Sequence, residues 1–255
     1  MVGNSLWRVA CPNPFVHANW LLLAIALPAL TVRADVCNPS LLVGTYAFQL
    51  SGMTTISATP KPTASLGVIT LDGNGGITGT ASATFAGFLL GNPVTGGYAA
   101  NWDCSIAWQL QDDAGAFQHF RGTYSPDGNR VQFKQADPGG APQGIMVKTP
   151  GACSPATLAK KYHYTISGNT TPMKPGDLPH SVSRQGTLDT VKGGSFQVAS
   201  DCSVLFQLSL PSLALEGAPP LPMNMRGFLV NDGREILAFQ TDPGAMVAAR
   251  LTALR

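Results

Sequence analysis

The sequence predicts an all-β protein made of two tandem antiparallel β-barrels, each with about seven to eight short strands. Short runs rich in Val, Thr, Phe and Tyr alternate with Gly- and Pro-containing turns, and no long segment shows helical periodicity. The landmarks of the first half also return in the second half at kept spacings. The chain has 44% apolar residues, a share that is ordinary for a globular protein and unlike a disordered one.

The internal repeat divides the chain after its N-terminal segment into two copies, residues 35–150 and residues 151–255. The same residue types recur in the same order, and local spacings are kept: nine residues from Cys to Tyr, and six and sixteen residues from Arg to the two following Asp residues. The paired landmarks are Cys37 and Cys153, Tyr46 and Tyr162, Asp103-Cys104-Ser105 and Asp201-Cys202-Ser203, Arg121 and Arg226, Asp127-Gly128 and Asp232-Gly233, and Asp137 and Asp242. We therefore expect a tandem duplication with one barrel in each copy.

Residues 1–34 have the pattern of a signal peptide. Arg8 supplies a positive charge, residues 20–30 form an apolar core, and small residues precede the expected cleavage after Ala34. An uncleaved membrane anchor is the alternative, but this apolar run is shorter than the ~20 residues that a spanning helix needs. We expect a secreted or periplasmic protein of the cell envelope, with no stable membrane span after cleavage.

The charge balance argues against a nucleic-acid partner. Removing residues 1–34 takes away Arg8 and Arg33, which leaves 14 of the 16 basic residues against 14 acidic residues. Binding to a phosphate backbone requires a basic surplus, which this near-neutral chain lacks.

Four cysteines remain after the signal peptide, and an even number in an exported chain implies two disulfides. Three connectivities are open, and the duplication favours one disulfide in each copy, Cys37–Cys104 and Cys153–Cys202. A metal site is the competing interpretation, but Cys-x-x-Cys or Cys/His spacing is absent. We therefore expect neither a metal nor another cofactor.

The strands of the first copy follow from alternating apolar runs between turns. The segment Asp72-Gly73-Asn74-Gly75 is typical of a tight hairpin turn. The second copy lacks a counterpart of the hairpin at about 73–90 and has a Pro-rich loop at 211–222, so we expect seven strands in an open or smaller barrel. One composite barrel or a pair of β-sandwiches remains an alternative. The strands expected in the first copy are 44–51, 66–71, 76–85, 95–102, 104–111, 116–124, 130–136 and 143–148.

Several of these elements resemble a group of exported bacterial tandem-repeat β-barrel proteins of unassigned function. The resemblance covers nearly all of both copies and rests mostly on turn and cysteine residues. It implies a calycin-like or allene-oxide-cyclase-like barrel, in which the Thr- and Pro-rich loops at 53–66 and 169–182 would lie at the barrel mouths. The residues that carry it are Gly44-Thr45-Tyr46, the run Gly-Val-Ile-Thr-Leu-Asp-Gly-Asn-Gly-Gly at 67–76, Gly97-Tyr98 before Asp103-Cys104-Ser105, and Gln135 with Asp137-Pro138-Gly139.

Polar residues that recur in both copies are the candidate ligand-binding residues. They would form a polar constellation in a barrel mouth that orients a ligand. The structural alternative is that the aspartates next to the disulfides cap backbone amides or pair with the arginines. Strand 116–124 leaves the question open, because the sequence does not say which of its faces points inward. The candidates are Asp103, Gln109, Arg121 and Gln135, with Asp201, Gln207, Arg226 and Gln240 in the second copy.

No catalytic residues are expected from motifs. His-x-His, His-Glu-x-x-His and Gly-x-Ser-x-Gly patterns are absent, and neither His119 nor His163 recurs in the other copy. The leading hypothesis is a secreted, non-catalytic binding module for a small apolar ligand or a cell-surface partner. The alternatives are a cyclase- or isomerase-like barrel that acts by positioning, and a structural or adhesive envelope protein.

Overall fold

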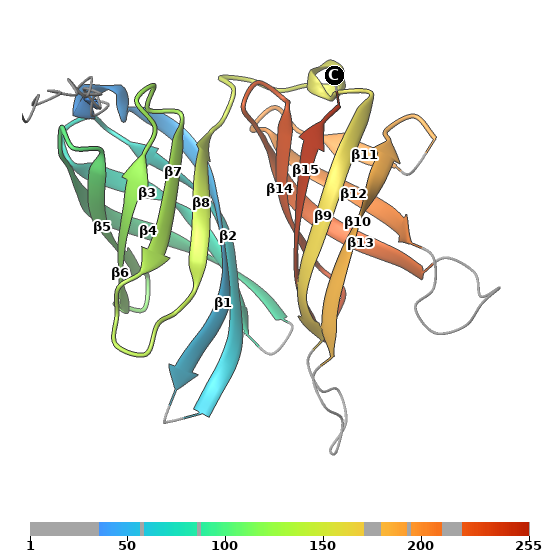
Figure 1. Ribbon diagram of the computed structural model, residues 1–255, viewed down its shortest axis with the longest axis horizontal. Helices are drawn as coiled ribbons and strands as arrows, with labels where there is room; N and C mark the ends of the chain where they lie inside the picture. Colours follow the sequence, from blue (N-terminus) through green and yellow to red (C-terminus); the bar gives the residue numbers. More distant parts are fainter. Residues whose placement is uncertain are drawn as a thin grey trace, which may run out of the picture. The chain divides into compact units, whose positions relative to one another are not determined.

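The computed structural model describes residues 36–56, 59–85, 88–170, 180–192, 195–210 and 221–254 (Figure 1). Residues Asp35–Arg255 form one compact unit. The described residues contain fifteen strands and two short 3₁₀ helices, η1 (Pro39–Leu41) and η2 (Pro155–Thr157). Among them, none forms a helix long and apolar enough to cross a membrane. The prediction of an all-β protein is confirmed.

The first copy forms a closed antiparallel barrel in which each strand pairs with the next in sequence order, and β8 pairs with β1. This is an up-and-down barrel, in which closure removes the exposed sheet edges. We call it the first barrel. Its strands are β1 (Gly44–Ile56), β2 (Thr59–Leu71), β3 (Gly76–Phe85), β4 (Phe88–Ala100), β5 (Ser105–Asp112), β6 (Phe117–Tyr124), β7 (Arg130–Gln135) and β8 (Gln143–Lys148).

The β1–β2 hairpin is longer than the sequence predicted. Most of the segment 53–66, expected as a mouth loop, continues the two strands, with Met53 opposite Pro62 and Ile56 opposite Thr59. Prolines fit there because β2 pairs with β3 only from Ala64 onward, so this part of β2 has a single neighbouring strand. The prediction of a mouth loop was wrong for these residues.

The second copy forms an open sheet of seven strands in the order β10-β9-β15-β14-β13-β12-β11. We call it the second sheet; β10 and β11 are its two edges (Figure 1). The expected seven strands are confirmed, and of the two expected arrangements, an open or a smaller barrel, the described strands form the open one. Its strands are β9 (Lys161–Thr170), β10 (Ser181–Asp189), β11 (Phe196–Val198), β12 (Ser203–Leu210), β13 (Leu221–Val230), β14 (Glu235–Gln240) and β15 (Ala245–Ala253).

The recurring landmark residues are the turns and links of each half. The disulfides Cys37–Cys104 and Cys153–Cys202 are both present, with Cα atoms 5.0 Å and 4.9 Å apart, so the expected pairing is confirmed. The second cysteine of each pair has a left-handed backbone, with φ of 68° at Cys104 and 67° at Cys202. Each pair links the entry of the chain into one half to the turn before its β5 or β12 strand.

A buried tyrosine in each half bonds to the Asp-Gly turn of the same half. The Tyr46 hydroxyl donates to the carbonyl of Gly128 at 2.7 Å, and the Tyr162 hydroxyl donates to that of Gly233 at 2.6 Å. Burial raises the pKa of both hydroxyls, so they remain donors. In each half, the recurring Tyr and the recurring Asp-Gly turn are therefore joined by a hydrogen bond.

Alternation along the strands separates an inner from an outer face. In β6, Phe120 and Tyr124 are buried inside the first barrel, whereas His119, Arg121 and Thr123 are exposed on its outer face. The structure thus shows which face of this strand points into the barrel, a question that the sequence left open.

A third apolar cluster joins the outer faces of the two sheets. It contains residues of β1, β2 and β8 on one side and residues of β13, β14 and β15 on the other. The second sheet is therefore covered by the first barrel on part of its outer face. The buried members are Ala47, Ala64, Leu66, Val147, Phe228, Val230, Leu237, Phe239 and Ala248.

Several expectations lie outside the described residues. They are the signal peptide at 1–34, residues 171–179 of the second Thr- and Pro-rich loop, and residues 211–220 of the Pro-rich loop; residues 221–222 belong to β13.

Candidate functional site

Aromatic side chains fill part of the interior of the first barrel. Trp108 lies with its ring centroid 5.3 Å from that of Phe120 and 4.8 Å from that of Phe133, and the two phenylalanines are 5.6 Å apart. A cavity beside Phe48, Leu110 and Phe120 has a volume of about 70 Å³. Ligand pockets usually measure ~300–1,000 Å³, so this cavity is too small for a drug-sized apolar ligand.

A larger hollow lies on the outer face of the same barrel. It has a volume of about 680 Å³ and crosses β4, β5 and β6, from Gly75 at one end to Asp137 and Pro138 at the other. We call it the outer groove. Two rows of residues line it, each running across the three strands in register. The rows are Gly97, Gln109 and His119, and Ala99, Ala107 and Arg121.

Small residues on β4 make room for the groove. Gly97 and Ala99 extend little from the sheet, while the longer Gln109 and Arg121 stand on the neighbouring strands. Arg121 is exposed, and its guanidinium forms no hydrogen bond or ion pair with any residue that the structure describes. A guanidinium without a partner is suited to bind a carboxylate or phosphate through two parallel hydrogen bonds.

One end of the groove is closed by a hydrogen-bonded cluster around Asp137. The His119 ring lies with Nδ1 2.7 Å from Asp137 Oδ1, and the His119 backbone amide donates to Oδ2 at 2.9 Å. Gln135 Nε2 donates to the same Oδ2 at 3.0 Å. Burial alone raises the pKa of the Asp137 carboxyl, but these hydrogen bonds outweigh it and hold the pKa below its ordinary value.

The second half repeats this cluster without a histidine. Asn224 donates to Asp242 from its backbone amide at 3.0 Å and from its side chain at 2.6 Å, and Gln240 Nε2 donates at 2.9 Å. Gln207 Nε2 donates to Asn224 Oδ1 at 2.8 Å. Since asparagine makes the same bonds as His119, the cluster holds the strand ends together and does not require an imidazole.

Asp103 and Asp201 stand at the disulfide turns and do not line the outer groove. Each accepts a hydrogen bond at 2.9 Å from a backbone amide two residues ahead, that of Ser105 or Ser203. The pKa of each carboxyl is lowered most by the hydrogen bond from the serine hydroxyl, and next by the hydrogen bond from this amide. This is the amide-capping arrangement that the structural alternative predicted.

The structure therefore brings some candidates together and separates others. Gln109 and Arg121 line the outer groove, and Gln135 supports its end. In the second half, Gln207 lines a hollow of about 330 Å³ on β12 and β13, while Gln240 supports Asp242. Arg226 is exposed and acts electrostatically on Asp201. A ligand-binding role for all of them remains a prediction.

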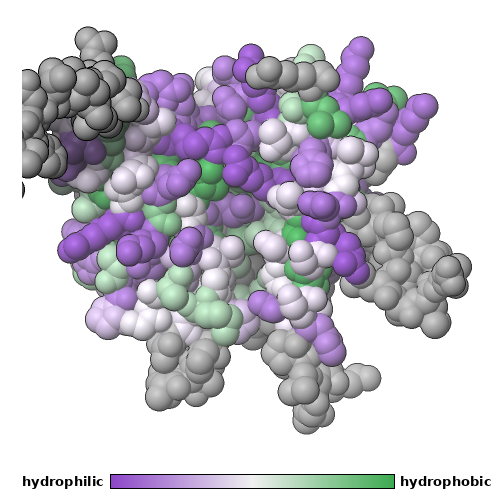
Figure 2. Space-filling view, viewed as in Figure 1, coloured by the Kyte–Doolittle hydropathy of each residue, from purple (hydrophilic) through white to green (hydrophobic). Residues whose placement is uncertain are grey.

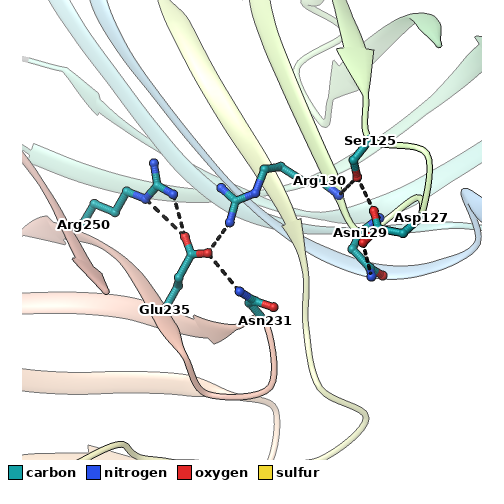
Figure 3. A network of polar contacts seen from close by, with 7 residues as sticks. All are labelled: Ser125, Asp127, Asn129, Arg130, Asn231, Glu235 and Arg250. Carbon is teal, nitrogen blue, oxygen red and sulfur yellow. Dashed lines mark hydrogen bonds and ion pairs between the residues drawn. The ribbon is translucent and has the colours of Figure 1, made fainter. Parts of the chain in front are cut away.

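Polar contacts between the two halves were not predicted from the sequence. Glu235 is 4% exposed and bonds to Arg130 from the first barrel and to Arg250 at 2.8 Å (Figure 3). Asn231 donates to the same carboxylate at 3.1 Å, and Gln49 Nε2 donates to the carbonyls of Ala238 and Ala249 at 2.8 Å and 3.0 Å.

A sequence signal for this contact existed. After Glu235, β14 has four successive apolar residues, Ile-Leu-Ala-Phe, whereas its counterpart β7, Arg-Val-Gln-Phe-Lys-Gln, alternates. Continuous apolar strands are typical of sheets buried on both faces. This run indicates that the outer face of β14 is covered.

Comparisons with known proteins do not identify the chain. No protein-family model matches it, and no curated protein matches it. Two solved structures of transferrin binding protein B are similar to it. One is a double mutant from Haemophilus parasuis Hp5 described as a vaccine antigen, with 8% identity and a TM-score of 0.29 over 83% of this chain and 75% of that chain. The other is the intact Ap-TbpB with its N and C lobes, with 7% identity and a TM-score of 0.25 over 82% and 76%. A likeness this distant carries no argument about function.

Proposed function

We propose that the protein is an exported, non-catalytic binding module that holds a surface partner in the outer groove of the first barrel. The observation that carries this proposal is the exposed guanidinium of Arg121, which has no partner among the described residues and lies beside small residues of β4. Gln109 adds a side-chain amide to the same groove, and His119 is held by Asp137 through Nδ1 with 53% of its side chain exposed. These groups favour a partner that presents carboxylates.

Export is part of the same proposal. The N-terminal pattern of residues 1–34 and the two disulfides favour an oxidising compartment, either secreted or in the cell envelope. We further propose that residues 35–150 and 151–255 are two domains that descend from one duplicated unit.

One face of the molecule has a predominantly polar surface (Figure 2). On the face shown in Figure 2, hydrophilic and neutral residues predominate and hydrophobic residues form separate patches. A small apolar ligand in the first barrel is less favoured, because the cavity beside the aromatic side chains measures only about 70 Å³. A positioning enzyme is also less favoured, because Asp103 does not share a cavity with Gln109 and Arg121.

The test is an NMR titration of ¹⁵N-labelled residues 35–255 with disulfides intact. Three polymers serve as probes: polyglutamate and polygalacturonate, which carry carboxylates, and neutral dextran. We expect the carboxylated polymers, and not dextran, to shift the amides of Gly97, Ala107 and Arg121. Arg121→Gln should weaken binding roughly tenfold, since a charge-assisted hydrogen bond is worth roughly 1.5–3 kcal/mol.

Arg226→Gln is the matched control, because it removes the same charge from the equivalent position of the second half. Equal loss in the two variants would show that attraction is non-specific. A titration in which no carboxylated polymer shifts the groove amides would overturn the proposal.

A further inference from the structure

The two halves differ by one hairpin, and its loss leaves an opening in the second sheet. In the first barrel, β3 lies between β2 and β4 and pairs with both. In the second half, β10 takes the place of β2 and β11 takes the place of the end of β4, but no described strand lies between them. The opening between β10 and β11 is therefore the position that β3 fills in the first barrel.

Strand direction explains why this opening does not close on itself. All neighbours in the second sheet are antiparallel, so the first and the seventh strands, β10 and β11, run in the same direction. An antiparallel barrel closes only with an even number of strands. One added strand, antiparallel to both β10 and β11, would complete eight.

The open edge of β10 presents backbone groups at odd-numbered residues. Thr190 N–H donates to Lys160 and Thr170 N–H donates to His180, so the even-numbered residues of β10 bond to β9. Since antiparallel strands alternate the direction of their N–H and C=O groups, Gln185 and Thr187 direct theirs to the opening.

On the open edge of β11, the even-numbered residues present their backbone groups. Ala199 N–H donates to Ser203, and Gln207 N–H donates to Ser195, so the odd-numbered residues of this edge bond to β12. Phe196 and Val198 therefore direct their backbone groups to the opening. The two edges face the same opening with donors and acceptors on each.

Apolar side chains lie on the inner side of both edges. Leu188 of β10 is buried, Val182 of β10 is partly buried, and Phe196 and Val198 of β11 pack against the same core. The ring of Phe196 stacks on that of Phe206 with centroids 5.1 Å apart. A strand in this position would cover these side chains with its own inward residues.

The first barrel shows what kind of strand fits. The inward residues of β3 include buried Ile77 and partly buried Ala81, whereas Thr78 and Thr80 are exposed. Alternate apolar and small residues thus face the core while threonines face solvent. The fit demands little side-chain volume.

The side chain of Arg184 occupies part of the open edge of β10. Arg184 Nη1 donates to the carbonyl of Ser183 at 2.8 Å, a backbone group that faces the opening. Charged side chains at a sheet edge discourage unwanted pairing. The accessible stretch therefore begins at Gln185.

We propose that the opening between β10 and β11 binds an extended segment of a partner protein, which adds as one antiparallel strand between the two edges. Backbone hydrogen bonds would hold the segment, and alternating small apolar residues would face the core of the second sheet. Strand addition is an established mode of peptide recognition, in which main-chain bonds supply affinity and alternate side chains supply specificity. This site is separate from the outer groove, and either can fail without the other.

The probe is a synthetic peptide with the sequence of β3, GITGTASATF, capped at both ends. It is titrated into residues 35–255 while amide hydrogen exchange is measured residue by residue. In the free protein we expect fast exchange at Gln185, Thr187, Phe196 and Val198, and slow exchange at Leu188. Saturating peptide should slow the four fast amides at least about tenfold and leave Leu188 unchanged.

Variants separate strand addition from other contacts. Gln185→Pro removes a donor from the open edge without removing a bond to β9, and should weaken peptide binding at least about tenfold. Gln185→Ala is the matched control and should bind like the wild type. Arg184→Ala should bind more tightly because the Ser183 carbonyl is freed. A peptide with Pro at the position of Thr80 should not bind.

Three results would overturn the proposal. The first is a peptide that leaves the four amides unprotected in the wild-type protein, a result that needs no variant to fold. The second is slow exchange of these amides in the free monomer, which would mean that the chain fills the opening itself. The third is protection that rises with protein concentration in the absence of peptide, which would mean that a second copy occupies it.

Discussion

The two halves share their turns and links but differ in how they bury their strands. Each has a disulfide at its entry, a buried tyrosine bonded to its Asp-Gly turn and an aspartate cluster at its strand ends. The first half closes into a barrel, whereas the second half remains an open sheet. The two halves thus share their local hairpin chemistry, while the described strands close into a barrel only in the first half.

The second half buries additional apolar side chains on its outer face. Phe228, Leu237 and Phe239 of the second sheet are buried against the first barrel, which contributes smaller residues such as Ala47 and Ala64. Buried apolar area stabilises by ~25 cal/mol per Å², so the larger side chains of the second half gain more from the contact. The difference teaches that the second half depends on its neighbour more than the first half does.

Separating the halves should produce the largest effect. We expect residues 35–150 alone to fold, and residues 151–255 alone to aggregate or remain unfolded, because the second half has two open edges and an apolar outer face. Circular dichroism and size-exclusion chromatography of each half, exported with its disulfide, make the measurement. Two equally stable halves would contradict the inference that the second half depends more on its neighbour.

Glu235→Ala should destabilise the intact chain by about 3 kcal/mol. The substitution leaves Arg130 and Arg250 without the carboxylate that both contact, in a setting where Glu235 is buried. Chemical denaturation measures the change. Asp232→Asn is the control, because it removes an acid at an exposed position in the turn just before β14. A loss as large as that of Glu235→Ala would argue against the buried network.

Tyr46→Phe should cost about 1–2 kcal/mol, since it removes one buried hydrogen bond to the Gly128 carbonyl. Tyr162→Phe should cost more in thermal unfolding, because the Tyr162 hydroxyl donates to the Gly233 carbonyl and also accepts from the Ala159 amide. If only Tyr162→Phe destabilised the chain, the second half would be shown to limit its stability.

Acidification should produce the smallest effect. The folded-state pKa values of Asp103 and Asp201 are lowered, so both carboxylates stabilise the fold above their unfolded pKa of about 3.9. This contribution is lost as the pH falls through the lowered values. Between pH 5 and pH 2, the double variant Asp103→Asn and Asp201→Asn should lose less thermal stability than the wild type. An unchanged slope would show that these turns do not contribute.

Much of the fold was accessible from the sequence because it depends on local signals. Asp-Gly and Asn-Gly pairs predicted the turns, and period-two runs predicted most of the strands. The recurrence of cysteines at matching landmarks predicted the disulfide pairs that the structure contains. The extension of the β1–β2 hairpin was missed, because Pro60 and Pro62 are typical of a loop unless the strand lacks a second neighbour there.

The candidate site was accessible only in part. Recurrence singled out Gln109 and Arg121, which line the outer groove, but it also singled out Asp103 and Gln135, which hold turns and strand ends. Duplication retains residues of both kinds, so recurrence does not separate them. Recurrence did not single out Glu235 and Arg130, because this ion pair joins one residue from each half and has no counterpart within either half.

The sequence by itself determined most strands and turns, the two disulfide pairs and the smaller number of strands in the second half, because each depends on residues close together in the chain or on matching motifs. Tertiary structure decided which face of β6 points inward, where the outer groove lies and which outer faces meet. Alternation defines two faces for every strand, but only packing against strands distant in sequence decides which one is buried.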